Sequence, residues 1–155
     1  MNRRYAANTD VPADRSKVEI ERLLQRYGAA KFASGWDQEQ AYIAFQMHGR
    51  HVRFILPLPD RNSREFTETP SRKRARDEQA AFAAWEQACR QRWRALALVV
   101  KAKLEAVEAG ITTMDAEFLN WVILPGGRTV GEIITPQIEE AYTSGRLPQL
   151  PPGAT

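Results

Sequence analysis

Cysteine and histidine are scarce in this sequence, which holds one cysteine, Cys89, and two histidines, His48 and His51. A single cysteine cannot close an internal disulfide. Cys89 falls among apolar residues at helical spacing, so we expect a buried, inert thiol in a reducing compartment. Neither histidine has a cysteine pair or a nearby carboxylate to complete a coordination shell. The sequence therefore argues against a disulfide scaffold, a metal site and a cysteine nucleophile.

Long apolar runs are missing as well. No stretch approaches the roughly 18 apolar residues of a membrane span, and residues 1–14 lack the apolar core of a signal peptide. We therefore expect a soluble, cytoplasmic protein that does not associate with membranes.

No group of residues suggests a catalytic site. The pairs Glu105 with Glu108 and Glu139 with Glu140 are expected on solvated helix surfaces. The turn at residues 126–129 lacks the spacing of a nucleotide-binding loop. We predict a protein that is not an enzyme and has no catalytic residue, metal or cofactor.

The overall composition is typical of one folded domain. Hydrophobic residues make up 43% of the 155 residues and charged residues 26%, which is enough for a single core without disulfides. We predict an α+β protein with a flexible arm at residues 1–14, one domain at residues 15–145 and an extended tail at residues 146–155. A mobile basic loop is expected within the domain, at residues 60–76.

The N-terminal part of the domain predicts a helix followed by a strand. Ser16 and Glu19 have the spacing of a capping box at the start of the helix, and Gly28 ends it. Residues 32–36 alternate in the manner of a short strand. The apolar face of the helix consists of Ile20, Leu23, Leu24 and Tyr27.

A β-hairpin over residues 41–56 is the clearest element. Either His48-Gly49 or Gly49-Arg50 can form its two-residue turn, since both registers keep the apolar residues on one face. The predicted apolar face of the sheet consists of Ile43, Phe45, Val52, Phe54 and Leu56.

Helical spacing returns after the basic loop and predicts one long helix from about Asp77 to Ala109, on the order of 45 Å in length. Thr112 or Thr113 can cap a short third helix. A second capping box, Thr129 with Glu132, opens a last helix. The residues expected to face inward on this last helix are Val130, Ile133, Ile134, Ile138, Ala141 and Tyr142.

Pro136 lies inside the last predicted helix. A proline lacks the N–H that a helix interior uses and crowds the preceding turn. We therefore expect either a kink at Pro136 or two short helices in sequence.

Charge is distributed unevenly along the chain. Residues 1–100 hold 18 of the 22 Lys and Arg but 12 of the 19 Asp and Glu, a net charge of +6, whereas residues 101–155 have a net charge of −3. This polarity favours an anionic partner, of which nucleic acid is the commonest. The candidate nucleic-acid-binding residues are Arg72, Lys73, Arg74, Arg76, Arg90, Arg94, Lys101, Arg50, Arg53 and Trp36.

The candidates come from three places. The tract at residues 71–76 is a basic loop, and Arg90, Arg94 and Lys101 form a stripe on the long helix. Trp36, with Tyr42 and Phe32, lies on strands that also carry arginines, as in a surface that stacks unpaired bases. The alternative is a charged helix face that is merely solvated, since Glu86 can pair with Arg90.

Four segments resemble a family of small, uncharacterised phage and prophage proteins: RLLQRY at residues 22–27, GRHVRFILPLP at 49–59, WEQACRQRWRA at 85–95 and GRTVGEIITPQI at 127–138. The resemblance covers most of the chain and implies a viral origin and a host cytoplasmic location, but no catalytic residue. The order helix, three strands, helix is also similar to double-stranded RNA-binding domains, although the C-terminal helices depart from them.

These observations lead to two functional hypotheses. The first is a non-enzymatic nucleic-acid-binding protein of phage DNA metabolism that favours single-stranded DNA, because aromatic residues sit near positive charge and no recognition helix is apparent. The alternative is a protein-interaction module, an inhibitor or adaptor, that docks a host or phage protein through the basic loop and helix.

Overall fold

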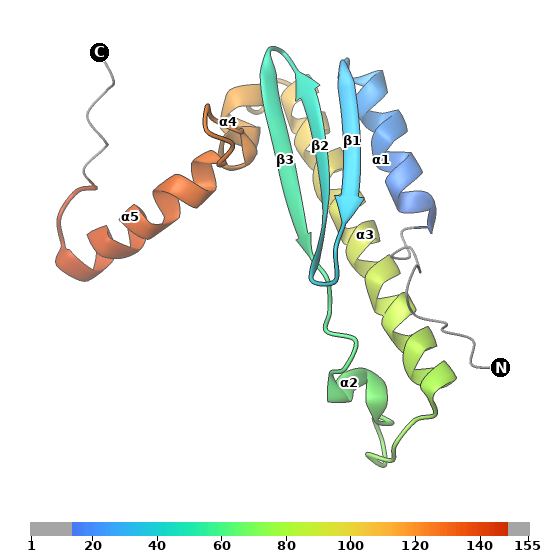
Figure 1. The fold of residues 1–155 in the computed structure, drawn as a ribbon. Coiled ribbons are helices and arrows are strands. Elements are labelled where there is room, and N and C mark those ends of the chain that lie inside the picture. The colour runs from blue at the N-terminus through green and yellow to red at the C-terminus, as the bar shows by residue number, and fades with distance from the viewer. Residues whose placement is uncertain (1–13, 149–155) are drawn as a thin grey trace.

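The computed structural model describes residues 14–148 (Figure 1). This part of the chain contains a three-stranded antiparallel sheet and five α-helices, which confirms the predicted α+β class. The predicted arm up to residue 13 and the predicted tail from residue 149 lie outside the described residues. None of the described helices is long and apolar enough to cross a membrane.

The sheet forms around a tight turn of two residues, His48 and Gly49, whose φ angles are 49° and 74°. Positive φ at both positions is what a type I′ turn requires, and the twist of that turn matches the twist of paired strands. The resulting register sets Ile43 opposite Phe54 and buries the predicted apolar face. The strands, in the order β1-β2-β3, are β1 (Lys31–Trp36), β2 (Gln40–Met47) and β3 (Arg50–Pro57).

Two helices pack together against the apolar face of the sheet, α1 (Asp14–Arg26) and α3 (Glu78–Glu108). The predicted long helix is confirmed, with Asp77 as its N-cap and Ala109 as its C-cap. The capping box expected at Ser16 is wrong, because α1 is already helical at Asp14. The spacing of Ser16 and Glu19 alone therefore did not locate the start of the helix.

The segment after β3 contains structure that its charged sequence does not suggest. Four of the residues expected in a mobile loop form α2 (Arg64–Thr67), which is capped by Ser63. Phe66 is only 3% exposed and packs into the core. A single apolar anchor produces no periodicity, so the sequence pattern could not reveal this helix.

The C-terminal third consists of α4 (Met114–Phe118), a 3-10 turn η1 (Leu119–Trp121) and α5 (Val130–Ser144). Thr113 caps α4, which settles the choice between Thr112 and Thr113. The chain then runs beside the edge of β3 and turns before α5. The predicted capping box of Thr129 and Glu132 is confirmed, with both of its hydrogen bonds present.

The helix α5 projects away from the rest of the molecule (Figure 1). The expectation that its apolar residues face inward is wrong for two of them, because Ile138 is 45% exposed and Tyr142 is 88% exposed. Val130, at the start of the helix, does pack against the core. Gly131 is the one buried residue of the helix, and a side chain at this position would overlap Asn120 of η1. Helical spacing shows which residues share a face but does not show whether another element covers that face.

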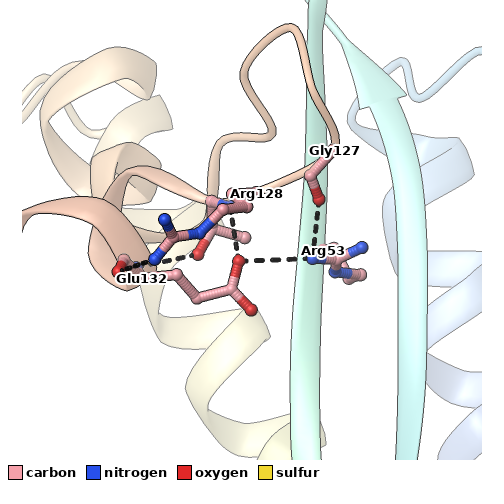
Figure 2. Close-up of polar contacts among 5 residues, drawn as sticks. Arg53, Gly127, Arg128 and Glu132 are labelled. Carbon is pink, nitrogen blue, oxygen red and sulfur yellow. Dashed lines mark hydrogen bonds and ion pairs between the residues drawn. The ribbon is translucent and has the colours of Figure 1, made fainter.

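Pro136 does not divide α5, so the alternative of two short helices is wrong. In a continuous helix the N–H at position 136 would donate to the carbonyl of Glu132, and proline has no N–H. The side chain of Arg128 supplies the missing donor, because its Nη2 atom lies 2.6 Å from the Glu132 carbonyl oxygen (Figure 2). The helix therefore passes through the proline without leaving this carbonyl unpaired.

Candidate polyanion-binding surface

The two helices behind the sheet run in the same direction (Figure 1). Tyr27, just after the end of α1, forms a hydrogen bond with Glu108 at the end of α3, and this bond raises the pKa of the Tyr27 hydroxyl. Leu24 and Ala97 are buried in the core, to which both helices contribute. This parallel packing leaves a shallow channel between the exposed flanks of the helices.

A groove of about 600 Å³ lies between α1 and α3, and most of the charged residues that line it are basic. The three arginines Arg15, Arg22 and Arg26 are spaced at i, i+7 and i+11 along α1, so at about 100° per residue they lie within an arc of about 40°. We call this feature the α1–α3 groove; its lining consists of Arg15, Val18, Glu19, Arg22, Leu23, Arg26 and Lys101.

The arginines of the α1–α3 groove are available for a ligand. None of the three forms an ion pair or a side-chain hydrogen bond within residues 14–148. Lys101 is only loosely paired, with its Nζ atom 3.9 Å from Glu105. Glu19 is the one acidic residue of the lining, so positive charge predominates along the groove.

The basic stripe of α3 continues from this groove toward the start of the helix. Arg94 precedes Lys101 by seven residues, about 10 Å along the axis, and lies close to the same face. Arg90, one turn earlier, donates a hydrogen bond from Nε to Gln87 at 3.3 Å. The predicted stripe is therefore extended by α1, which sequence reasoning missed.

The basic tract occupies a separate position, at the N-terminal end of α3 between that helix and α2 (Figure 1). Arg72, Lys73 and Arg74 are exposed there, in a turn closed by two backbone hydrogen bonds, from the Thr69 N–H to the Arg74 carbonyl and from the Lys73 N–H to the Thr69 carbonyl. Arg76 is anchored instead, because its Nη1 atom donates to the Phe66 carbonyl at 3.2 Å. Three of the four predicted tract residues thus extend into solvent.

The two hairpin arginines have structural partners. Arg50 forms a two-pronged ion pair with Asp115 of α4, at 3.0 and 3.2 Å. Arg53 donates to the Gly127 carbonyl at 3.0 Å and lies 3.4 Å from the Glu132 carboxylate (Figure 2). These contacts hold α4 and the start of α5 against β3.

Trp36 does not share a surface with Tyr42. The sheet register pairs Trp36 with buried Ala41 and pairs Tyr42 with Gly35, so the two aromatic side chains lie on opposite faces of the sheet. Phe32 is on the face of Trp36, whereas Arg53 is on the face of Tyr42. The structure therefore does not assemble the expected stacking surface for unpaired bases.

The tryptophans of the helices pack in the core or against it. Trp85 and Trp93 are buried, and Trp121 stacks on Phe54 with ring centroids 4.7 Å apart. Cys89 is also buried, and burial raises the pKa of its thiol to about 11. Within residues 14–148 no three His, Cys, Asp or Glu side chains gather as a metal site would require.

No family model matches this chain, and the comparisons found no curated protein and no solved structure similar to it. The resemblance to phage proteins therefore stays a prediction.

The arginines of α1 carried a signal that sequence reasoning did not use. The helical projection that revealed the stripe on α3 also gathers Arg15, Arg22 and Arg26 on one flank of α1. The prediction for this helix considered only its apolar face and therefore omitted the three arginines. What no projection reveals is that α1 and α3 bring their basic flanks together, because this depends on tertiary packing.

Proposed function

We propose that the protein binds the phosphate backbone of nucleic acids through the α1–α3 groove. The observation that carries the proposal is the row formed by Arg15, Arg22 and Arg26, which have no acidic partner in the described chain and face Lys101 across the groove. Arginine and lysine contacts to phosphates supply most of the sequence-independent affinity for nucleic acids.

The length of the row favours a polymer over a small anion. From Arg15 to Arg26 the helix rises about 16 Å, which corresponds to roughly five nucleotides at about 3.4 Å each. The groove is an open channel without aromatic residues in its lining, so it suits a backbone and offers no surface for base stacking. The exposed residues Arg72, Lys73 and Arg74 add positive charge farther along α3.

The single-strand preference expected from the sequence is not part of this proposal. That preference depended on Trp36 and Tyr42 sharing one surface, and they lie on opposite sides of the sheet. We expect binding to single strands and duplexes alike, with little dependence on sequence. The resemblance to phage proteins is consistent with a role in phage DNA metabolism.

Fluorescence anisotropy with labelled single-stranded and duplex oligonucleotides tests the proposal. We expect the affinity to fall steeply with salt, because bound cations release counterions from the phosphates. The double variant R22A/R26A should bind more weakly and flatten the dependence of log affinity on log salt by about 1 for each arginine removed.

A matched control is K31A/R146A, which removes two exposed cations outside the groove and reaches the same net charge. It should leave the salt dependence close to that of the wild type. Affinity weaker than about millimolar, or affinity that does not change with salt, would refute nucleic-acid binding. Equal losses in the two double variants would show that net charge and not the groove is responsible.

A second candidate is docking of an acidic protein surface in the same groove. Val18 lines the groove and is 46% exposed, and Leu98 on α3 is 64% exposed. Exposed apolar residues beside cations suit a protein partner. A pull-down from lysate, with and without nuclease, separates the two functions: a protein that stays bound after digestion, and is lost from R22A/R26A, supports this candidate.

A further inference from the structure

The strand β1 has one edge without a partner. The order β1-β2-β3 places β1 at one side of the sheet, whereas the edge at the other side, on β3, is bridged by Val122. Within residues 14–148 no segment pairs with the outer edge of β1. The backbone groups along this edge are therefore open to a further strand.

A hydrogen bond from the Asp37 N–H to the Gln40 carbonyl shows which residues bond to β2. In an antiparallel pair every second residue bonds to the same neighbour, so the residues of β1 that are two and four positions before Asp37 also bond to β2. The residues between them turn their N–H and C=O groups away from the sheet. These residues are Phe32, Ser34 and Trp36.

This edge also lacks the usual protection. Natural edge strands commonly carry proline or several charges, which discourage pairing with another chain. The strand β1 has no proline, and Lys31 at its first position is its one charged residue. Trp36 is 45% exposed, although the register places it on the side of the sheet that packs against the helices. An exposed tryptophan beside open backbone groups indicates a place where another strand pairs.

We propose that two copies of the chain pair their β1 strands antiparallel about a two-fold axis at Ser34, which joins the two three-stranded sheets into one sheet. This register sets Phe32 opposite the partner's Trp36 and sets Ser34 opposite itself. It uses the open N–H and C=O groups of all three residues, whereas a shift of the register by two residues leaves some of them unpaired. Both copies keep their helices on the same side of the joined sheet.

The side chains of β1 favour a second copy over another protein, because in this register the strand complements itself. On the helix side Phe32 lies beside the partner's Trp36, and cross-strand aromatic pairs stabilise a sheet. On the outer side Lys31 lies beside the partner's Asp37. The two-fold axis repeats both contacts.

Both charged residues are available for this contact. Lys31 forms no ion pair within residues 14–148. Asp37 holds its own turn through Oδ1, which accepts from the N–H groups of Glu39 and Gln40 at 2.8 Å, so Oδ2 is left for the lysine. Because both side chains are exposed, the ion pair favours the register and adds little to the affinity.

Light scattering of the full chain over a range of concentrations tests the pairing, and we expect the mass of a dimer. S34P removes an N–H that points away from β2, so the sheet should remain folded. It also removes two hydrogen bonds at the axis, which should raise the dissociation constant about tenfold or more. The matched control S34A keeps the N–H and should dimerise like the wild type, and far-UV circular dichroism compares the fold of the two variants.

A cysteine at the axis gives a second test that does not depend on proline. In such a pair the two opposed Cα atoms lie about 5.5 Å apart, which a disulfide can span. S34C should therefore form a disulfide-linked dimer under mild oxidation. L98C, on an exposed position of α3, should form little, and the native Cys89 is buried.

A monomer mass at every concentration overturns the proposal, and so does a folded S34P that dimerises as well as S34A. Equal cross-linking by S34C and L98C overturns it as well. The residues of the β1 edge are distinct from Arg15, Arg22 and Arg26, so this proposal and nucleic-acid binding can each fail without the other.

Discussion

At the scale of single residues, the contact between Arg128 and Glu132 explains how a proline fits inside α5. Residue 136 cannot donate to the Glu132 carbonyl, and the guanidinium of Arg128 does so from the preceding turn at 2.6 Å. A charged donor lying that close to a carbonyl forms a strong hydrogen bond. Arg128 and Pro136 should therefore be energetically coupled.

We expect R128A to weaken α5 by about 1 kcal/mol, the typical net value of one hydrogen bond. Hydrogen exchange of the α5 amides measures the loss. In a P136A background the backbone N–H returns, so the same R128A change should cost clearly less. If R128A destabilises α5 equally in both backgrounds, Arg128 does not act by bonding the Glu132 carbonyl that Pro136 leaves without a donor.

At the scale of elements, the capping box ties α5 to the sheet through one carboxylate. The Glu132 side chain accepts a hydrogen bond from the Thr129 backbone N–H at 2.6 Å and lies near the Arg53 guanidinium. The hydrogen bond from Thr129, aided by the charge of Arg53, lowers the pKa of Glu132. The charged carboxylate is therefore the form that the folded protein prefers.

This preference makes α5 sensitive to acid. Because the pKa is lower in the folded state, the stabilisation is fully present above the ordinary glutamate pKa of about 4.3 and is lost as the pH falls through the folded value. We expect hydrogen exchange of the α5 amides to accelerate in that range beyond its intrinsic pH dependence. In E132Q this extra acceleration should be absent; if it persists, other carboxylates are responsible.

Elements whose residues form a repeating local pattern were predictable from the sequence. The alternation around His48-Gly49 predicted the hairpin, and the apolar spacing after Asp77 predicted α3. The short helix α2 depends on Phe66 alone, which has no repeating neighbour. The direction of α5 depends on Arg53 meeting Gly127 and Glu132, contacts between residues more than 70 positions apart that no local pattern contains.

At the scale of the whole molecule, the sign of the charge was predictable and its location was not. The excess of cations in the first hundred residues is plain from the sequence. Folding then directs Arg50 and Arg53 to carboxylates of the acidic C-terminal third, and it brings the arginines of α1 beside α3. The candidate surface therefore differs from the predicted one because long-range packing decides which cations stay available.

The same packing joins the C-terminal helices to the sheet through a cluster of rings. Phe118 of α4 is completely buried and meets Phe45 and Phe54 edge-to-face, with ring centroids 6.0 and 6.1 Å apart. Phe54 also stacks on Trp121 of η1. One cluster thus connects two strands with the chain that leads to α5, so the sheet and α4 should unfold together.

We expect F118A to lower the free energy of unfolding by about 3–5 kcal/mol, the usual cost of removing a buried ring. In denaturant, tryptophan fluorescence and far-UV circular dichroism should report one coincident transition in both proteins. The neighbouring Leu119 is 54% exposed, so L119A should change stability by only about 0.5 kcal/mol. If the ring cluster joins the C-terminal helices to the sheet, neither part is stable without the other. Separate transitions for the two probes would therefore show that the C-terminal helices unfold independently and would contradict this prediction.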